Sequence, residues 1–68
     1  MTRKEQREAR HEARMKYLYF LRAGNSPKEA KVKLDQWGKA TYGAVPWAEI
    51  LAFLAPFIKA IIEKWLKV

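Results

Sequence analysis

The hydrophobic pattern changes character twice along the chain, and each change marks a new segment. Residues 3–23 contain no Gly or Pro and are rich in Glu, Ala, Arg, Lys and Leu, which are good helix formers. The first half of this stretch shows no apolar stripe. From Tyr17 to Leu21 every side of a helix would be apolar, which predicts either burial on all faces or a contact with another element. We therefore expect a charged, basic helix over about 3–23, within a first segment of residues 1–23.

The second segment, residues 24–45, begins at a break in the pattern. Gly24 suits a helix C-terminal cap in the left-handed region. Ser26 can act as the next N-cap, with Pro27 at the first helical position and Glu29 completing a capping box. This arrangement predicts a short basic helix that starts at 27.

Apolar spacing sets the expected length of this second helix. Ala30, Leu34 and Trp37 recur at i, i+4 and i+7, which predicts one buried face over 27–37. Residues 38–45 contain two glycines and precede Pro46, so they are expected to form a loop.

The third segment, residues 46–68, has the widest apolar surface. A helix over about 46–67 gathers a narrow polar strip of Glu49, Pro56, Lys59, Ala60, Glu63, Lys64 and Lys67. Its remaining face consists of Trp47, Ile50, Leu51, Phe53, Leu54, Phe57, Ile58, Ile61, Ile62, Trp65 and Leu66. This face covers well over half the circumference, whereas a surface helix of a soluble domain needs an apolar arc of about 100°. Pro56 lacks an N–H group and is expected to kink the helix.

Such a surface can pack against copies of the chain, against another protein, or into lipid. Trp47 and Trp65 are separated by a helical rise of about 27 Å, close to the hydrocarbon thickness of a bilayer. Against a span, Lys59 near its centre costs roughly 2.5–3.5 kcal/mol on the insertion scale. A helix lying in the membrane interface, with its lysines at the headgroups, is the other lipid alternative. The expected fold is therefore all-α, with three helices, and oligomeric or membrane-associated.

Composition narrows the possible functions. The 68 residues include 14 Lys or Arg and 7 Asp or Glu, and residues 1–45 carry 11 of the basic and 5 of the acidic side chains. A net charge of +7 favours anionic partners, such as nucleic acid or an acidic membrane face. The chain has no Cys and a single histidine, His11, so no metal or other cofactor site is expected. No N-terminal signal peptide is recognisable.

The arginines of the first segment form a regular row. Arg3, Arg7, Arg10 and Arg14 recur at i, i+4, i+7 and i+11 and would line one face of a helix. Three glutamates, at positions 5, 8 and 12, would lie on the opposite face. Guanidinium groups bind phosphates bidentately, so this row is the candidate phosphate-binding site.

Two short stretches resemble nucleic-acid-binding elements. Residues 2–10 look like the arginine-rich peptides of phage antiterminators, which implies RNA contact. Residues 24–34 are similar to the first helix of a helix-turn-helix module through Gly24, Ser26, Glu29 and Leu34. The departures are Lys31 at a position that is usually small and apolar, a long expected turn downstream, and a following helix without polar base-reading side chains.

No catalytic motif is present, so we expect a binding protein and not an enzyme. The favoured hypothesis is a membrane-associated, self-assembling helical protein whose arginine row contacts phosphates, for example a small phage or virion structural component. A nucleic-acid-binding module with an apolar dimer-core helix is the first alternative. A leaderless cationic antimicrobial peptide is the second.

Overall fold

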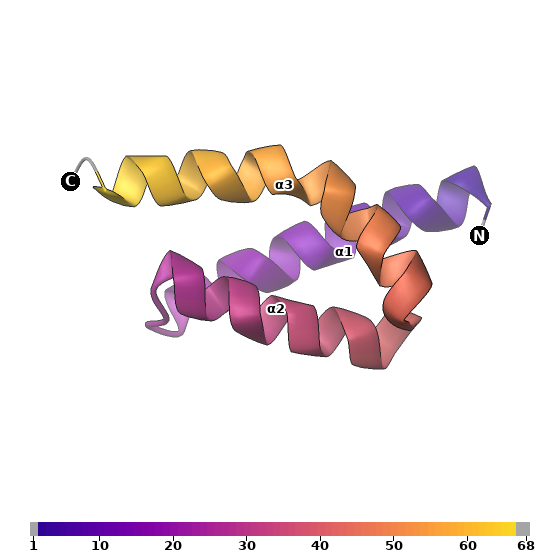
Figure 1. Cartoon of the computed structure of the whole chain (residues 1–68), viewed down its shortest axis with the longest axis horizontal. Helices are drawn as coiled ribbons and strands as arrows, with labels where there is room; N and C mark the ends of the chain where they lie inside the picture. Colours follow the sequence, from indigo (N-terminus) through magenta and orange to yellow (C-terminus); the bar gives the residue numbers. More distant parts are fainter. Residues whose placement is uncertain (1, 67–68) are drawn as a thin grey trace.

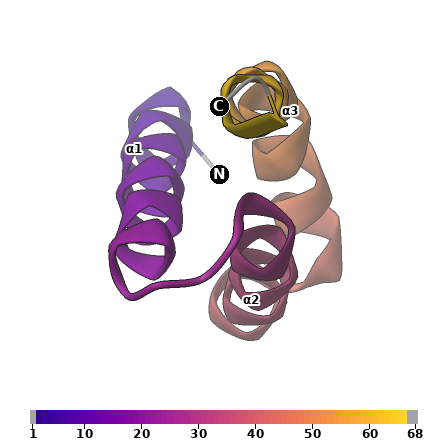
Figure 2. The same ribbon diagram turned by 90° about the vertical axis from the view of Figure 1, so that its left-hand side faces the viewer.

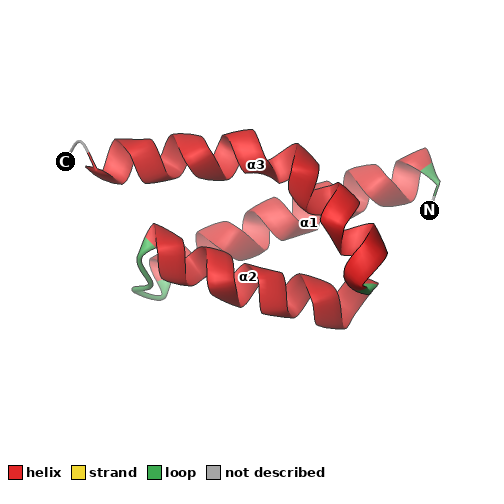
Figure 3. Cartoon of the chain, viewed as in Figure 1, coloured by secondary structure: helices red, strands yellow, loops and turns green. Residues whose placement is uncertain are grey.

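The protein folds into three helices joined by two tight connections (Figure 1). The computed structural model describes residues 2–66, which form α1 (Arg3–Arg22), α2 (Pro27–Tyr42) and α3 (Ala44–Leu66). Within this range all regular structure is helical and strands are absent, which confirms the expected all-α class (Figure 3). The expected end of the third helix at 67, Lys67 of its polar strip and the side chain of Leu66 lie outside the described residues.

Helix α1 has an apolar stripe that the sequence analysis did not identify. Ala9, Ala13 and Tyr17, spaced by four residues, are buried on one side of the helix. Two of these residues are alanines, so the stripe is narrow and brings the α1 backbone close to its neighbours. The Tyr17 hydroxyl donates a hydrogen bond to the carbonyl of Pro27 at 3.1 Å, which satisfies this buried group and ties α1 to the start of α2.

The connection between α1 and α2 forms as the sequence predicts, with one exception. Gly24 has a φ of +101°, and its N–H and that of Asn25 donate to the carbonyls of Leu21 and Phe20, as in a Schellman cap. The Ser26 hydroxyl accepts from the N–H of Glu29 at 3.2 Å and so caps α2. The exception is Glu29, whose side chain does not complete the predicted capping box with Ser26. Within residues 2–66, the complete reciprocal box forms instead at the start of α1, between Thr2 and Glu5.

Helix α2 is longer than predicted, because residues 38–42 continue the helix and do not form a loop. Its buried row extends by one more step of four residues, from Ala30 and Leu34 to Gly38. A Cβ atom at Gly38 would overlap the indole ring of Trp47. Glycine here is therefore a packing requirement and not a helix terminator. The actual break is Gly43, whose φ of +90° ends α2 one residue before α3 begins.

Helix α3 lies along the furrow between the other two helices, and the end-on view shows the three as a triangle (Figure 2). Its central row, Trp47, Ile50, Leu54 and Ile58, is buried. Pro56 lies inside the helix, and Figure 1 shows a change of direction within the orange part of α3, as expected of a proline kink.

The width of the apolar face on α3 follows from this position between two partners. Phe57, on one edge of the face, packs against Tyr17 of α1 with ring centroids 6.3 Å apart. Leu51 and Ile62, on the other edge, lie toward α2 and are half-buried. The two partner helices cover the centre of the face and leave both edges partly open.

Replacing Gly38 by Ala tests the corner between α2 and α3. In an ordinary helix interior this change stabilises by about 0.5–1 kcal/mol. Here the added methyl group meets the Trp47 ring, so we expect a loss of about 1–3 kcal/mol in the free energy of unfolding, measured by urea denaturation. Gln36→Ala, at an exposed position of the same helix, serves as the control and should change stability little. A gain of stability in Gly38→Ala would contradict the close contact.

Candidate anion-binding and apolar surfaces

The predicted arginine row lies along one flank of α1. Arg3, Arg7 and Arg14 are exposed, whereas Arg10 is half-buried. Arg7, Arg10 and Arg14 surround a shallow hollow of about 230 Å³ together with His11, and Arg3 lies outside it. The structure thus brings three of the four predicted residues together and adds a histidine that sequence analysis did not assign.

Two of these arginines lie over aromatic rings of α3. The guanidinium carbon of Arg10 is 4.0 Å from the centroid of Phe53, and that of Arg14 is 5.3 Å from the centroid of Phe57. The Nε–H of Arg10 also donates to the Gln6 carbonyl at 3.3 Å. These contacts place cations directly beside apolar surface and hold the Arg10 side chain in one orientation. We call the group of Arg7, Arg10, Arg14, Phe53 and Phe57 the arginine–aromatic flank.

The repeat of four residues on both helices explains the pairing. Arg10 and Arg14 are four residues apart on α1, and Phe53 and Phe57 are four residues apart on α3, so one turn of each helix separates both pairs. This shared spacing was visible in the sequence. What the sequence did not show is which edge of the wide α3 face lies toward α1.

The acidic side of α1 lies toward α2. The Tyr42 hydroxyl donates a hydrogen bond to a carboxylate oxygen of Glu12 at 3.0 Å. Burial, this hydrogen bond and the negative charge of Glu12 together raise the pKa of Tyr42 from its ordinary 10 to about 12. Glu12 therefore contacts α2, whereas Arg10 and Arg14 on the opposite side of α1 contact α3.

An aromatic cluster of Trp37, Tyr42 and Trp47 fills the corner between α2 and α3. Tyr42 and Trp47 stack with an interplanar angle of 6°, and Trp37 meets both rings edge-on. The indole N–H of Trp47 donates to Asp35 at 3.3 Å. Trp47 is only 1% exposed, so it belongs to the core and not to a membrane interface in this conformation.

The predicted apolar face of α3 divides into three parts. Trp47, Ile50, Leu54 and Ile58 are buried in the core of the chain itself. Leu51, Phe57, Ile61 and Ile62 are half-buried at its edges. Phe53 and Trp65 remain 60% and 54% exposed. The predicted face therefore forms an intramolecular core first, and only its edges are available to a membrane or another copy.

Helix α3 still meets the length and composition of a membrane span. Within the 22 residues of Ala44–Trp65, an 18-residue window reaches a mean hydropathy of 1.7, so this helix is long and apolar enough to cross a bilayer. Core helices of soluble proteins can pass the same test, but only 22% of the qualifying window is buried within this chain. Within residues 2–66, no group of three His, Asp or Glu side chains lies close enough to hold a metal ion.

Of the three departures from the helix-turn-helix pattern, the long turn is corrected, whereas Lys31 and the apolar third helix remain. The connection after α2 is the single residue Gly43, not the long turn that we expected. The apolar row of α3 nevertheless packs against α1 and α2, so this helix does not present a polar recognition face. Comparison with known protein families, curated proteins and solved structures gives no significant match.

The raised pKa of Tyr42 predicts a loss of stability at high pH. The folded state favours the neutral phenol of Tyr42. The contribution of this phenol to the free energy of unfolding is therefore complete below pH 10 and disappears as the pH rises through about 12. Tyr42→Phe removes the ionisable hydroxyl. In this variant the free energy of unfolding, measured by urea denaturation at successive pH values, should fall less between pH 10 and about 12. Glu12→Gln should lower the pKa of Tyr42, measured from the ultraviolet absorbance of the phenolate. An unchanged pKa in Glu12→Gln would contradict the contact.

Proposed function

We propose that this protein is a non-enzymatic binding protein that lies on an anionic membrane surface through the arginine–aromatic flank. Copies would then associate on that surface through the exposed edges of α3. A component placed between lipid and a protein shell, as in a virion, would use both surfaces. The position of Arg10 and Arg14 over Phe53 and Phe57 carries this proposal.

Charged groups layered over aromatic rings suit the boundary between headgroups and hydrocarbon. A guanidinium group binds a lipid phosphate bidentately, while the ring beneath it enters the outer part of the acyl region. Phe53, at 60% exposure, has enough free surface to make such a contact. The long arginine side chains would let the guanidinium groups remain at the level of the phosphates while the rings lie deeper.

The packing of α1 on α3 favours a helix that lies in the interface over one that spans. Arg10 and Arg14 sit beside Phe53 and Phe57, which are in the middle of the 22-residue apolar stretch. A span of the intact bundle would carry both guanidinium groups toward the bilayer centre, at roughly 2.5–3.5 kcal/mol each on the insertion scale. Spanning would therefore require α1 to separate from α3.

Self-association is supported by the apolar side chains that the chain leaves uncovered. Val45 and Trp65, which lie outside the arginine–aromatic flank, are each more than half exposed. On a membrane, concentration in two dimensions would favour contacts between the α3 edges of neighbouring copies. The membrane phosphates would also offset the repulsion between chains that each carry +7.

Nucleic-acid binding is the second candidate, and the hollow formed by Arg7, Arg10, His11 and Arg14 favours it. These side chains could surround a single phosphate group of any origin. RNA or DNA would bind with a strong salt dependence and without any need for Phe53.

A pair of charge-matched variants tests the membrane proposal. Arg10→Gln with Arg14→Gln removes two charges from the flank, whereas Lys33→Gln with Lys39→Gln removes two exposed charges from α2. Each cation near an anionic surface contributes about 1 kcal/mol, so we expect the arginine pair to weaken partitioning into phosphatidylserine vesicles by roughly tenfold to thirtyfold. The lysine pair should weaken it far less.

Sedimentation of vesicles and gel shifts with RNA and duplex DNA separate the two candidates. Equal losses from both variant pairs would mean that net charge alone attracts the protein. Shifts of nucleic acid without vesicle binding would assign the flank to nucleic acid. Phe53→Ser should weaken vesicle binding and leave any nucleic-acid shift unchanged.

A further inference from the structure

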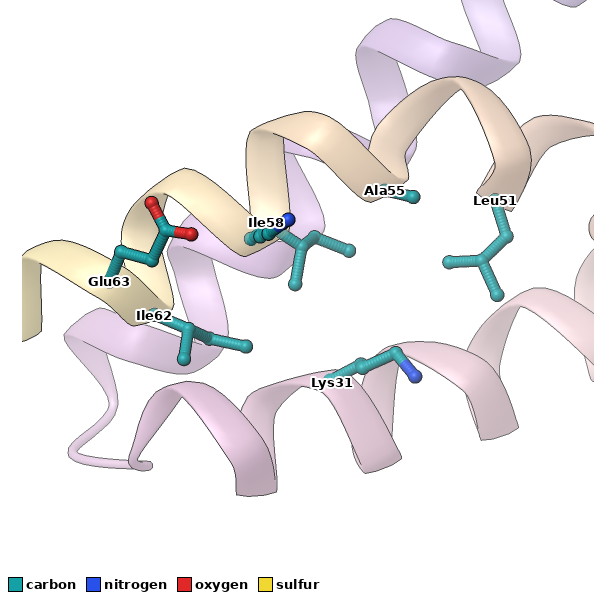
Figure 4. Close-up of a pocket in the computed structure, with 7 residues that line it drawn as sticks. Lys31, Leu51, Ala55, Ile58, Ile62 and Glu63 are labelled. Atoms are coloured by element: carbon teal, nitrogen blue, oxygen red, sulfur yellow. The ribbon is translucent and has the colours of Figure 1, made fainter. Parts of the chain in front are cut away.

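A second concave surface lies between α2 and α3, on the side of α3 away from the arginine–aromatic flank. It is a groove of about 480 Å³ whose apolar wall is formed by Leu51, Ala55, Ile58 and Ile62 of α3. Figure 4 shows Leu51, Ile58 and Ile62 directed from α3 toward α2, with Lys31 on the facing helix. This volume falls in the range of sites that enclose a small molecule.

The groove is open because of the residue types that face it. Ala55 contributes a single methyl group from α3. At the facing position of α2, a branched apolar side chain would fill the space, but this position is Lys31. The ammonium group of Lys31 cannot be buried without a partner, so the lysine side chain does not close the groove. Ile58 is buried, whereas Leu51 and Ile62 are half-buried and retain apolar surface toward the groove.

The apolar surface continues beyond Ile62 toward the N-terminus of α2. Ile62 also lines an adjoining hollow of about 230 Å³, together with Ser26, Pro27, Lys28 and Trp65. The two hollows share Ile62 as a lining residue and lie one after the other along the α2–α3 edge, and we call the pair the apolar track. A long, thin, flexible ligand matches a track of this kind better than a compact one.

The charges beside the track are mostly positive. Lys31 and Lys59 line the groove, and Lys28 lines the adjoining hollow. Glu63 is the acidic residue among the lining side chains. An occupant with an anionic head and an alkyl tail would complement both the charge and the apolar wall.

We propose that this groove binds one medium-chain fatty acid. The alkyl chain lies along Leu51, Ile58 and Ile62, and the carboxylate is held by Lys31 and Lys59. A second copy of the chain fits this groove less well, because it would bring another positively charged chain against Lys31 and Lys59. The self-association proposed above places no second copy in this groove. This site does not depend on the arginine–aromatic flank.

Calorimetric titration of the full chain with decanoate, below its micelle concentration, tests the proposal. We expect saturable binding of one molecule per chain. Octanoate is shorter by two methylene groups. Because each buried methylene strengthens binding by up to about fourfold, octanoate should bind roughly tenfold more weakly than decanoate. Decanol has the same chain without the charge and should also bind several-fold more weakly.

Three variants locate the site. Ala55→Phe fills the groove from an exposed position and should abolish decanoate binding while circular dichroism shows unchanged helix content. Lys31→Gln with Lys59→Gln should weaken decanoate binding about tenfold and leave decanol binding unchanged. Lys33→Gln, on the same helix but outside the groove, is the matched control and should have no effect. If Ala55→Phe fails to fold, the lysine pair still decides the outcome.

Several results would overturn the proposal. Equal binding of decanoate and decanol, or decanoate binding that survives both the groove-filling and the lysine variants, would show that no such site exists. Concentration-dependent dimerisation that Ala55→Phe abolishes would assign the groove to a second copy.

Since Arg10 and Arg14 lie on the other side of α3, their variants should leave decanoate binding intact. A loss of vesicle binding with intact decanoate binding would thus separate the two surfaces.

Discussion

The contact between Trp47 and Gly38 determines how the three helices are placed. The indole packs where a side chain at position 38 would be, so α2 and α3 approach closely just before the single-residue connection at Gly43. Stacking with Tyr42 and the hydrogen bond to Asp35 fix the orientation of the ring. With this corner set, α3 runs back along the furrow between α1 and α2. The arginine–aromatic flank and the apolar groove are the two edges of that furrow.

Much of this arrangement was available from the sequence, where local chemistry decides the structure. Gly24 and Ser26 act as predicted because caps depend on residues within a few positions of each other. The arginine row lies on one flank of α1, and the buried pair of Ala30 and Leu34 was correctly identified. The arginine row and the buried pair depend on helical periodicity alone, and the caps depend on neighbouring residues alone.

The features that sequence analysis missed all depend on contacts between helices. Gly38 looked like a helix breaker because its role is to accommodate Trp47, nine residues away. Ala9 and Ala13 did not look like core residues, because alanine surrounded by charges is also typical of a solvent-exposed helix. The site residues show the same limit. The arginines were identified, but their aromatic partners could not be, since nothing in the local pattern shows which edge of α3 lies toward α1.

The wide apolar arc of α3 has a different meaning in this fold than in an isolated helix. Read alone, an arc of more than half the circumference indicates a membrane span or an oligomer core. In the bundle, Leu54 and Ile58 at its centre are core, while the edges near Phe53 and Ile62 border positively charged side chains from the neighbouring helices. Two apolar edges, each next to cations, are the surfaces through which the proposed contacts with amphiphiles would be made. A continuous uncharged surface would instead be expected of a helix that enters hydrocarbon.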